Sequence, residues 1–147
     1  MRDILTYLAS SRYCVEDLIE NELVALPEDT VIADAVKVMK DGGISSILVR
    51  SLSSSAKDPI ITGIVTERDI LYRVIGGNKG PYKTILKEVM SSPVVTIEKG
   101  SSVGEAMSLM RNKKIRRLLV IERENNKAVT LGLVTLMSIT DGMNHDQ

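Results

Sequence analysis

Residues 24–36, VALPEDTVIADAV, align without a gap to residues 95–107, VTIEKGSSVGEAM, at an offset of 71 residues. The offset shortens to 69 residues between Gly63 and Gly132, because the loops before these glycines differ in length. A repeat of this length is a supersecondary unit and not low-complexity sequence. The two copies agree in their apolar pattern and disagree at a few polar positions, so we look for function at those positions.

Each copy has the pattern of a strand, a helix, two strands and a second helix. The first helix of each copy carries apolar residues on one stripe, which predicts a single packed face. In copy one, Gly42 and Gly43 end that helix, since glycine adopts the left-handed conformation of a helix exit. In copy two, Ser102 and Glu105 have the spacing of a capping box. The stripes are Ile32, Ala35, Val36 and Met39 in copy one, and Val103, Ala106, Met107 and Met110 in copy two.

Two short apolar strands follow the first helix of each copy, and in copy one they span residues 47–49 and 60–65. Polar connections join the strands, SLSSSAKDP at 51–59 and ERENNK at 122–127. Their Ser, Asn, Pro and charged residues predict exposed hairpin loops. A threonine then stands where the last strand gives way to the second helix, and it can cap the first turn. These threonines are Thr66 and Thr135.

The composition excludes several classes of protein and site. The 147 residues include 19 basic and 19 acidic side chains, so no net charge draws the chain to nucleic acid or to an anionic membrane. Cys14 is the only cysteine, which excludes an intrachain disulfide, and the only histidine is His145 in the tail. The lone cysteine and the absence of an apolar run of about 20 residues predict a soluble, cytoplasmic protein without a membrane span.

We expect five segments along the chain. The stretch between the copies is rich in glycine and broken by Pro81, so it predicts a linker, and it lacks the spacing of a phosphate-binding P-loop. The start of the chain predicts a helix that packs through residues such as Ile4, Leu8, Val15 and Leu18. The segments are an N-terminal helical segment at 1–14, repeat 1 at 15–76, a linker at 77–84, repeat 2 at 85–143 and a tail at 144–147.

The paired repeats, which end in GIVTERD at 63–69 and in its relic GLVTLMS at 132–138, resemble the CBS-domain pair, also called a Bateman module. The resemblance covers about residues 10–143 and depends on duplication with matched register more than on either heptapeptide. It implies an α+β fold of two tandem β-α-β-β-α repeats related by a pseudo-twofold axis, with the sheets packed against each other and the helices outside. It also implies a regulatory protein and not an enzyme.

Members of this family often bind adenosine-containing ligands in clefts between the two repeats. The resemblance therefore implies AMP, ADP or ATP as a regulatory ligand, with no required cofactor. In the first cleft, Asp69 would accept hydrogen bonds from the ribose hydroxyls, since a carboxylate is a pure acceptor. Arg116 and Arg117 would bind phosphate. The implied contact residues are Ile64, Thr66, Arg68, Asp69, Pro93, Val94, Val95, Ile115, Arg116, Arg117 and Met137.

Several of these residues have specific implied roles. Thr66 would contact the ribose or the nearest phosphate, and residues 93–95 would contact the adenine. Ile64 and Ile115 would close an aliphatic slot around the base. Arg68 can point to the ligand or to solvent, and Met137 stands where some related modules carry a lysine.

The second cleft lacks the charged residues of the first. Ser138 takes the place of Asp69, and Ser45 and Ser46 take the place of the arginine pair. We therefore expect one strong site and one weak or empty site in each chain.

Two questions stay open in the sequence. Asp69 can serve only its own helix, where a carboxylate meets the positive end of the dipole. The run KKIRR at 113–117 can be a phosphate clamp, a nucleic-acid patch or a solvated surface. The preferred function is a homodimeric sensor that controls a partner protein in trans. The alternative is a dimerising adaptor or scaffold with a vestigial cleft, or a module that binds nucleic acid through Lys113 to Arg117.

Overall fold

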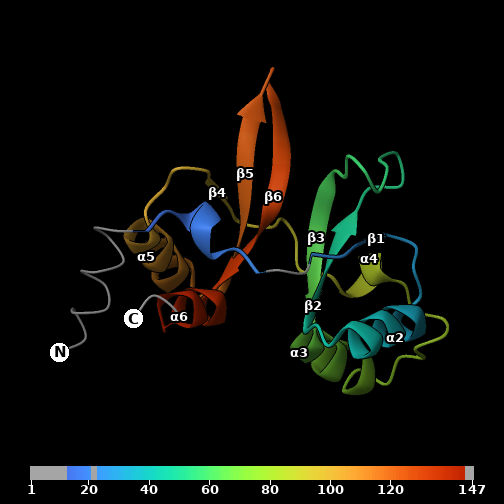
Figure 1. The fold of residues 1–147 in the computed structure, drawn as a ribbon. Helices are drawn as coiled ribbons and strands as arrows, with labels where there is room; N and C mark the ends of the chain where they lie inside the picture. The colour runs from blue at the N-terminus through green and yellow to red at the C-terminus, as the bar shows by residue number, and fades with distance from the viewer. Residues whose placement is uncertain (1–12, 21–22, 145–147) are drawn as a thin grey trace. The chain divides into compact units, whose positions relative to one another are not determined.

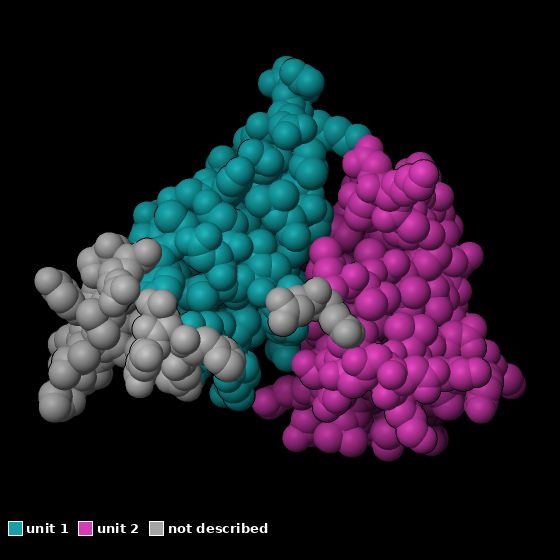
Figure 2. Space-filling model, viewed as in Figure 1, with its two compact units in different colours: residues 1–21, 95–147 teal, residues 22–94 magenta. Residues whose placement is uncertain are grey.

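The computed structural model describes residues 13–20 and 23–144, with the side chains of the last two left out (Figure 1). It confirms an α+β fold with two three-stranded sheets. The chain forms two compact units (Figure 2). Unit 1 consists of residues 1–21 and 95–147, and unit 2 of residues 22–94. Most of the predicted N-terminal helical segment, including Ile4 and Leu8, lies outside the described residues.

Unit 2 contains the first repeat. Its sheet has the order β1-β2-β3, with β1 parallel to β2 and β2 antiparallel to β3. Two helices follow β3 without a break, and the second of them is π-helical. Thr66 at the end of β3 caps the first turn of these helices. The elements are β1 (Ala25–Pro27), α2 (Ile32–Gly42), β2 (Ser46–Arg50), β3 (Ile61–Thr66), α3 (Glu67–Asp69), η2 (Ile70–Ile75) and α4 (Leu86–Val89).

Unit 1 contains the second repeat and has the same topology, with the sheet order β4-β5-β6. β4 is parallel to β5, and β5 is antiparallel to β6. The elements are η1 (Val15–Leu18), β4 (Thr96–Glu98), α5 (Val103–Lys113), β5 (Arg117–Glu124), β6 (Lys127–Thr135) and α6 (Leu136–Asn144). Among the described residues, no helix is long and apolar enough to cross a membrane.

Each unit has its own apolar core, built by side chains from its sheet and its helices. The helix stripes predicted from the sequence supply three buried residues to each core. In unit 2 the core consists of Ile32, Ala35, Met39, Ile47, Val49, Val65, Val74, Leu86 and Val89. In unit 1 it consists of Val15, Leu18, Ile97, Val103, Ala106, Met110, Leu118, Val120, Val134 and Ile139.

The predicted helix ends are confirmed. Gly43 ends α2 in the left-handed conformation, with φ 63° and ψ 32°. Ser102 caps α5, since its hydroxyl accepts from the Glu105 backbone N–H at 3.1 Å. The Glu105 carboxylate accepts in return from the Ser102 backbone N–H at 3.3 Å, which completes the predicted capping box.

Two predictions about surface residues are wrong. The polar stretch 122–127 is not a loop, because β5 and β6 run on through it and the turn consists of Asn125 and Asn126 alone. Both asparagines have positive φ, as a tight two-residue hairpin turn requires. The hairpin therefore extends well beyond the three-residue β4 (Figure 1). Val36 is 39% exposed, because α2 turns only Ile32, Ala35 and Met39 fully into the core.

The short helix at the start of each repeat packs into the core formed by the rest of the other repeat. η1 begins the first repeat, yet Val15 and Leu18 lie in the core of unit 1. α4 begins the second repeat, yet Leu86 and Val89 lie in the core of unit 2. The boundaries of the compact units therefore differ from the boundaries of the sequence repeats.

Matching hydrogen bonds hold the chain just after each of these short helices. In unit 1, the Glu20 backbone N–H donates to the Leu133 carbonyl at 2.8 Å. In unit 2, the Ser91 backbone N–H donates to the Ile64 carbonyl at 2.9 Å. Glu20 and Ser91 are 71 residues apart, and Ile64 and Leu133 are 69 apart, as the repeat requires. The internal repeat thus extends to the segments that the two repeats exchange.

Candidate functional site

The predicted ligand contacts divide between the two compact units. Unit 2 contains Ile64, Thr66, Arg68, Asp69, Pro93 and Val94, and unit 1 contains Val95, Ile115, Arg116, Arg117 and Met137. We describe each group within its own unit.

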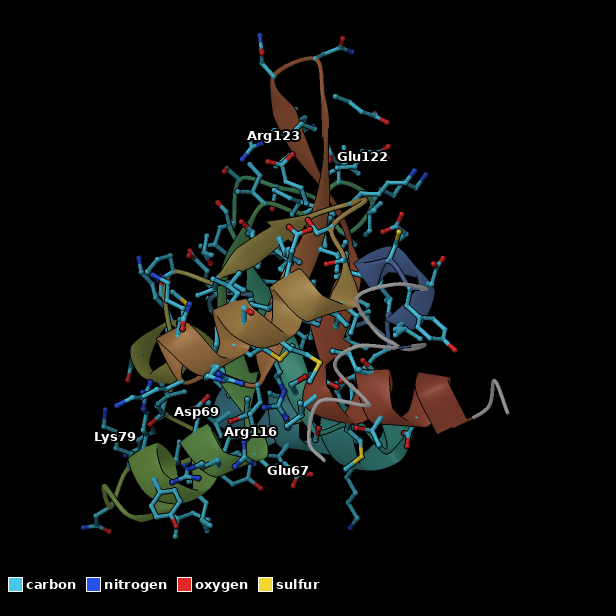
Figure 3. All side chains as sticks on the ribbon, turned by 90° about the vertical axis from the view of Figure 1, so that its left-hand side faces the viewer. Glu67, Asp69, Lys79, Arg116, Glu122 and Arg123 are labelled. Atoms are coloured by element: carbon cyan, nitrogen blue, oxygen red, sulfur yellow. The ribbon has the colours of Figure 1, made fainter. Side chains whose placement is uncertain are left out.

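Asp69 caps the helix on which it lies (Figure 3). Its Oδ2 accepts from the Thr66 backbone N–H at 2.9 Å and from the Thr66 hydroxyl at 3.1 Å. The Asp69 backbone N–H donates to the Thr66 hydroxyl at 3.2 Å. The structure therefore confirms a helix-capping role for Asp69, one of the two roles that the sequence left open. A carboxylate has about four acceptor sites, so Oδ1 can still accept from a ligand.

Ser138 keeps the same cap in unit 1 without a charge. Its Oγ accepts from the Thr135 backbone N–H at 2.8 Å, and its backbone N–H donates to the Thr135 hydroxyl at 2.9 Å. The Ser138 hydroxyl donates to the Thr135 carbonyl oxygen at 3.0 Å. A serine thus satisfies the same backbone N–H as Asp69 does. It follows that the cap explains a polar residue at this position but does not explain a carboxylate.

Arg73 is a site residue that the sequence reasoning missed. Its Nη1 donates to the carbonyl oxygens of Val89 at 2.8 Å and Met90 at 3.2 Å. Its Nε lies 3.9 Å from Asp69 Oδ1. Arg73 therefore joins the Asp69 helix to the end of α4. The available signal was an acid and a base at i and i+4 on a predicted helix.

An antiparallel bridge brings the predicted adenine contacts close to the GIVTERD segment. Ile64 and Ser91 exchange two backbone hydrogen bonds, at 3.0 and 2.9 Å. This bridge fixes the start of the segment Ser91–Val94 beside β3, two residues from Thr66. The sequence assigned Pro93 and Val94 to the second repeat, whereas the structure places them in unit 2 with Ile64.

The two predicted arginine contacts of unit 1 lie where α5 leads into β5. Arg116 is exposed and directly precedes β5, at the opposite end of the strand from Arg123 (Figure 3). Its backbone carbonyl accepts from the Leu136 N–H at 3.1 Å, which joins it to the start of α6. Arg117 is half-buried, and its Nε has no hydrogen-bond partner among the described residues. A buried donor without an acceptor is unfavourable.

Two other predicted contacts lie at the surface. The Arg68 guanidinium carbon lies 5.3 Å from the ring centre of Tyr72, within the range of a cation–π contact. Arg68 therefore has a partner on its own helix pair. Met137 is 68% exposed on α6. A thioether cannot replace the charge of a lysine at this position.

Comparison with other sequences finds matches to both repeats. The sequence model of the CBS domain matches residues 15–76 and 86–144. The chain is 37% identical over 113 residues to an uncharacterised protein of Methanopyrus kandleri, a match that covers 77% of this chain and 53% of that protein. It is 31% identical over 128 residues to an inosine-5'-monophosphate dehydrogenase of Nitrosopumilus maritimus, covering 87% of this chain and 24% of the enzyme. The chain thus spans about half of the first relative and about a quarter of the second.

Solved structures give the same result. A protein with CBS domains from Burkholderia ambifaria aligns with a TM-score of 0.74 at 26% identity, covering 92% of this chain and 96% of that one. A hexameric CBS-CP12 protein from bloom-forming cyanobacteria aligns with a TM-score of 0.73 at 27% identity, covering 87% and 66%. Both likenesses extend over most of the chain and therefore over both repeats.

Proposed function

The chain belongs to the CBS-domain family of regulatory modules, and from that premise we propose that it binds an adenosine-containing ligand and thereby controls a partner protein in trans. AMP, ADP and ATP are the ligands that we favour, because the adjacent arginines Arg116 and Arg117 favour phosphate over a sulfonium group. The proposal includes no catalytic role, since members of this family are typically regulatory. The matched dehydrogenase resembles this chain only over its CBS part.

One observation carries the proposal. Asp69 and Ser138 cap equivalent helices through the same backbone N–H, so the charge on Asp69 exceeds what the fold requires. A carboxylate at the end of β3, with Oδ1 free of the cap, suits two vicinal ribose hydroxyls. Both hydroxyls would donate to it, and hydrogen bonds to a charged group are the stronger kind.

The family pattern assigns the remaining contacts of an adenosine ligand. In this assignment, Ile64 and Ile115 contact the faces of the base, while the backbone of the segment 93–95 selects adenine. The bridge between Ile64 and Ser91 supports this, because it holds the chain two residues before that segment close to Thr66. Arg116 and Arg117 then bind the phosphate through their guanidinium groups.

The same comparison supports a single strong site in each chain. At the second site, Ser138 replaces the carboxylate, and its hydroxyl hydrogen is already donated to Thr135. Ser45 and Ser46 replace the two arginines. A ligand there would lack charged partners for both its ribose and its phosphate, so we propose that this second site is weak or empty.

We also propose that the module acts as a homodimer in the cytoplasm, where a lone thiol such as Cys14 stays reduced. A protein of the same family is hexameric, which supports self-association. The regulated protein is a separate chain in this proposal.

Calorimetry of the purified protein with AMP, ADP, ATP, S-adenosylmethionine and NAD tests the sensor proposal. We expect an adenine nucleotide to bind more tightly than millimolar, and we expect Asp69→Ala to weaken it by at least about tenfold, the loss of one charged hydrogen bond. Lys79→Ala is a matched control, since Lys79 is exposed in the same unit and belongs to no assigned contact. Binding no tighter than millimolar for all five ligands, or an unchanged affinity in Asp69→Ala, would refute the proposal.

Nucleic-acid binding remains the second candidate, because five cations lie within residues 111–117. It predicts salt-dependent binding of DNA or RNA that is lost when Arg116 and Arg117 are both replaced by alanine. A scaffold with a vestigial cleft predicts neither kind of binding. The same protein preparations therefore separate the three functions.

A further inference from the structure

A groove within unit 1 combines basic and apolar side chains. It lies between the C-terminal half of α5, the chain that leads into β5 and the start of α6, and its volume is about 420 Å³. Three of its residues are cations, Arg111, Lys114 and Arg116, and Ser108 adds a hydroxyl. Its remaining residues are Gly104, Met107, Met110, Ile115 and Leu136. We call this the basic groove.

The charge of the basic groove comes from the sequence of the second repeat and not from the fold. The equivalent helix pair of unit 2 also forms a groove, lined by Val36, Met39, Lys40, Glu67, Ile70, Leu71 and Ile75. That groove contains one cation and one anion, so its formal charge is zero. Position by position, Gly43 and Ser45 of the first repeat become Lys114 and Arg116 in the second. Two cations have thus been added to one copy of the same surface.

Within the part of the chain that the structure describes, the cations of the basic groove have no counter-charge. Residues 111–117 include five cations, and residues 106–121 include no acidic residue. None of the five forms an ion pair with a carboxylate of the described residues. Toward the other end of β5, in contrast, Lys99 pairs with Glu122 and Arg123 with Glu98. The helix dipole favours cations in the last turn of α5, which accounts for Arg111 but not for Arg116 beyond the helix.

Lys114 occupies a strained backbone position to reach the groove. It has φ 58° and ψ 44° in the left-handed region, where a residue with a Cβ is disfavoured. The first repeat places Gly43 at the equivalent position, with φ 63° and ψ 32°. A glycine would therefore end α5 as well as it ends α2. A lysine at a position where glycine is better for the fold indicates that its ammonium group is used.

We propose that the basic groove binds two or more linked phosphates. A single phosphate carries about two negative charges, whereas three cations line the groove, so one phosphate would leave the charge unbalanced. The apolar walls formed by Met107, Ile115 and Leu136 strengthen the attraction by excluding water. This inference rests on the proposed function where the phosphates belong to an adenine nucleotide, because Ile115 and Arg116 are contacts in both. It then identifies the ligand as ADP, ATP or a longer polyphosphate ester, and not AMP.

Three variants of the full chain test the proposal. Lys114→Gly removes one cation and restores the residue that suits the backbone, so a loss of binding is not a loss of folding. Arg111→Gln removes a second cation. Lys113→Ala is the control, because Lys113 is exposed in the same basic run but does not line the groove. Each protein is titrated by calorimetry with AMP, with ATP and with inorganic tripolyphosphate, at one fixed and low salt concentration.

We expect wild type to bind ATP more tightly than AMP. Lys114→Gly and Arg111→Gln should each lower the affinity for ATP about tenfold, which corresponds to the loss of one charged contact. Both variants should lower the affinity for AMP much less. Lys113→Ala should leave both affinities unchanged. Tripolyphosphate distinguishes the two sources of the phosphates. If tripolyphosphate binds to wild type and its affinity falls in the variants, the groove accepts free phosphate chains. If only the affinity for ATP falls in the variants, the phosphates belong to the nucleotide.

Equal affinities of wild type for AMP and ATP would overturn the inference and leave the sensor proposal intact. An equal effect of Lys113→Ala and Lys114→Gly would also overturn it, since the charge would then act as a general field and not as a site. If no adenine nucleotide binds, the sensor proposal fails, and tripolyphosphate decides alone. If tripolyphosphate binds to wild type and does not bind to Lys114→Gly, the phosphate site is upheld. If tripolyphosphate does not bind to wild type, the phosphate site is overturned.

Discussion

Asp69→Ser separates the capping role of Asp69 from its proposed ligand role, because it copies the residue of the second repeat. The serine can accept from the Thr66 backbone N–H as Ser138 accepts from Thr135 at 2.8 Å, so the cap is retained. The substitution removes the ion pair between Asp69 Oδ1 and Arg73 Nε, which lie 3.9 Å apart. The Arg73 side chain is 49% exposed. Such a pair contributes up to about 0.5 kcal/mol. We therefore expect a melting temperature within about 1–2 °C of wild type.

Ligand binding should respond much more strongly than stability. When two ribose hydroxyls lose a charged acceptor, the binding free energy falls by at least about 1.5 to 3 kcal/mol. This loss corresponds to about one to two decades in affinity. Thermal unfolding with and without saturating nucleotide measures both effects, since a ligand that binds only the native state raises its melting temperature. Thr66→Val is the reference for the stability lost with the cap. It removes the hydroxyl that accepts from the Asp69 N–H and should cost about 1 kcal/mol of stability.

Two results would refute this reasoning. If Asp69→Ser keeps the nucleotide-induced rise in melting temperature, the carboxylate does not bind the ligand. If Asp69→Ser without ligand is destabilised more than Thr66→Val, the carboxylate is needed by the fold, and the comparison with Ser138 is wrong.

Three further predictions concern packing, turn geometry and assembly. Gly132→Ala places a Cβ against Ile19 Cγ2 and should cost about 1–3 kcal/mol in urea unfolding, whereas an unchanged midpoint would contradict the described packing. Asn126→Gly should raise the unfolding free energy by about 0.5–1 kcal/mol, because residue 126 has φ 65° in the hairpin turn, and a lower stability would argue against that turn. Light scattering should give the mass of a dimer, and a monodisperse monomer at high concentration would exclude the proposed homodimer.

The element order could be predicted from the sequence because each copy supports the other. The spacing of Ser102 and Glu105 and the pair Gly42 and Gly43 encode helix ends through local hydrogen bonds and backbone conformation, which neighbouring residues determine. The hairpin was predicted too short for the opposite reason. ERENNK is polar along its whole length, and polarity does not distinguish an exposed strand from a loop when Asn125 and Asn126 alone can make the turn.

The packing partners of the short helices could not be predicted. Val15, Leu18, Leu86 and Val89 are apolar, but an apolar side chain does not specify which of two similar cores it enters. Only the folded chain shows that each pair packs into the core of the repeat to which it does not belong in the sequence.

The candidate site shows the same limit. The carboxylate of Asp69 stands out from the sequence because the other copy has Ser138. Its contacts do not, since the hydrogen bonds of Arg73 to the carbonyls of Val89 and Met90 depend on where α4 lies. Val36 was assigned to the core because its stripe position is correct, but the helix is covered on only part of that stripe.

The exchanged short helices make each compact unit depend on both repeats. A polypeptide with one repeat alone would carry a short helix that does not fill its own core and a core that lacks its short helix. In this chain, α4 completes the core of unit 2 and η1 completes the core of unit 1. A cut between the two repeats would therefore leave both cores incomplete.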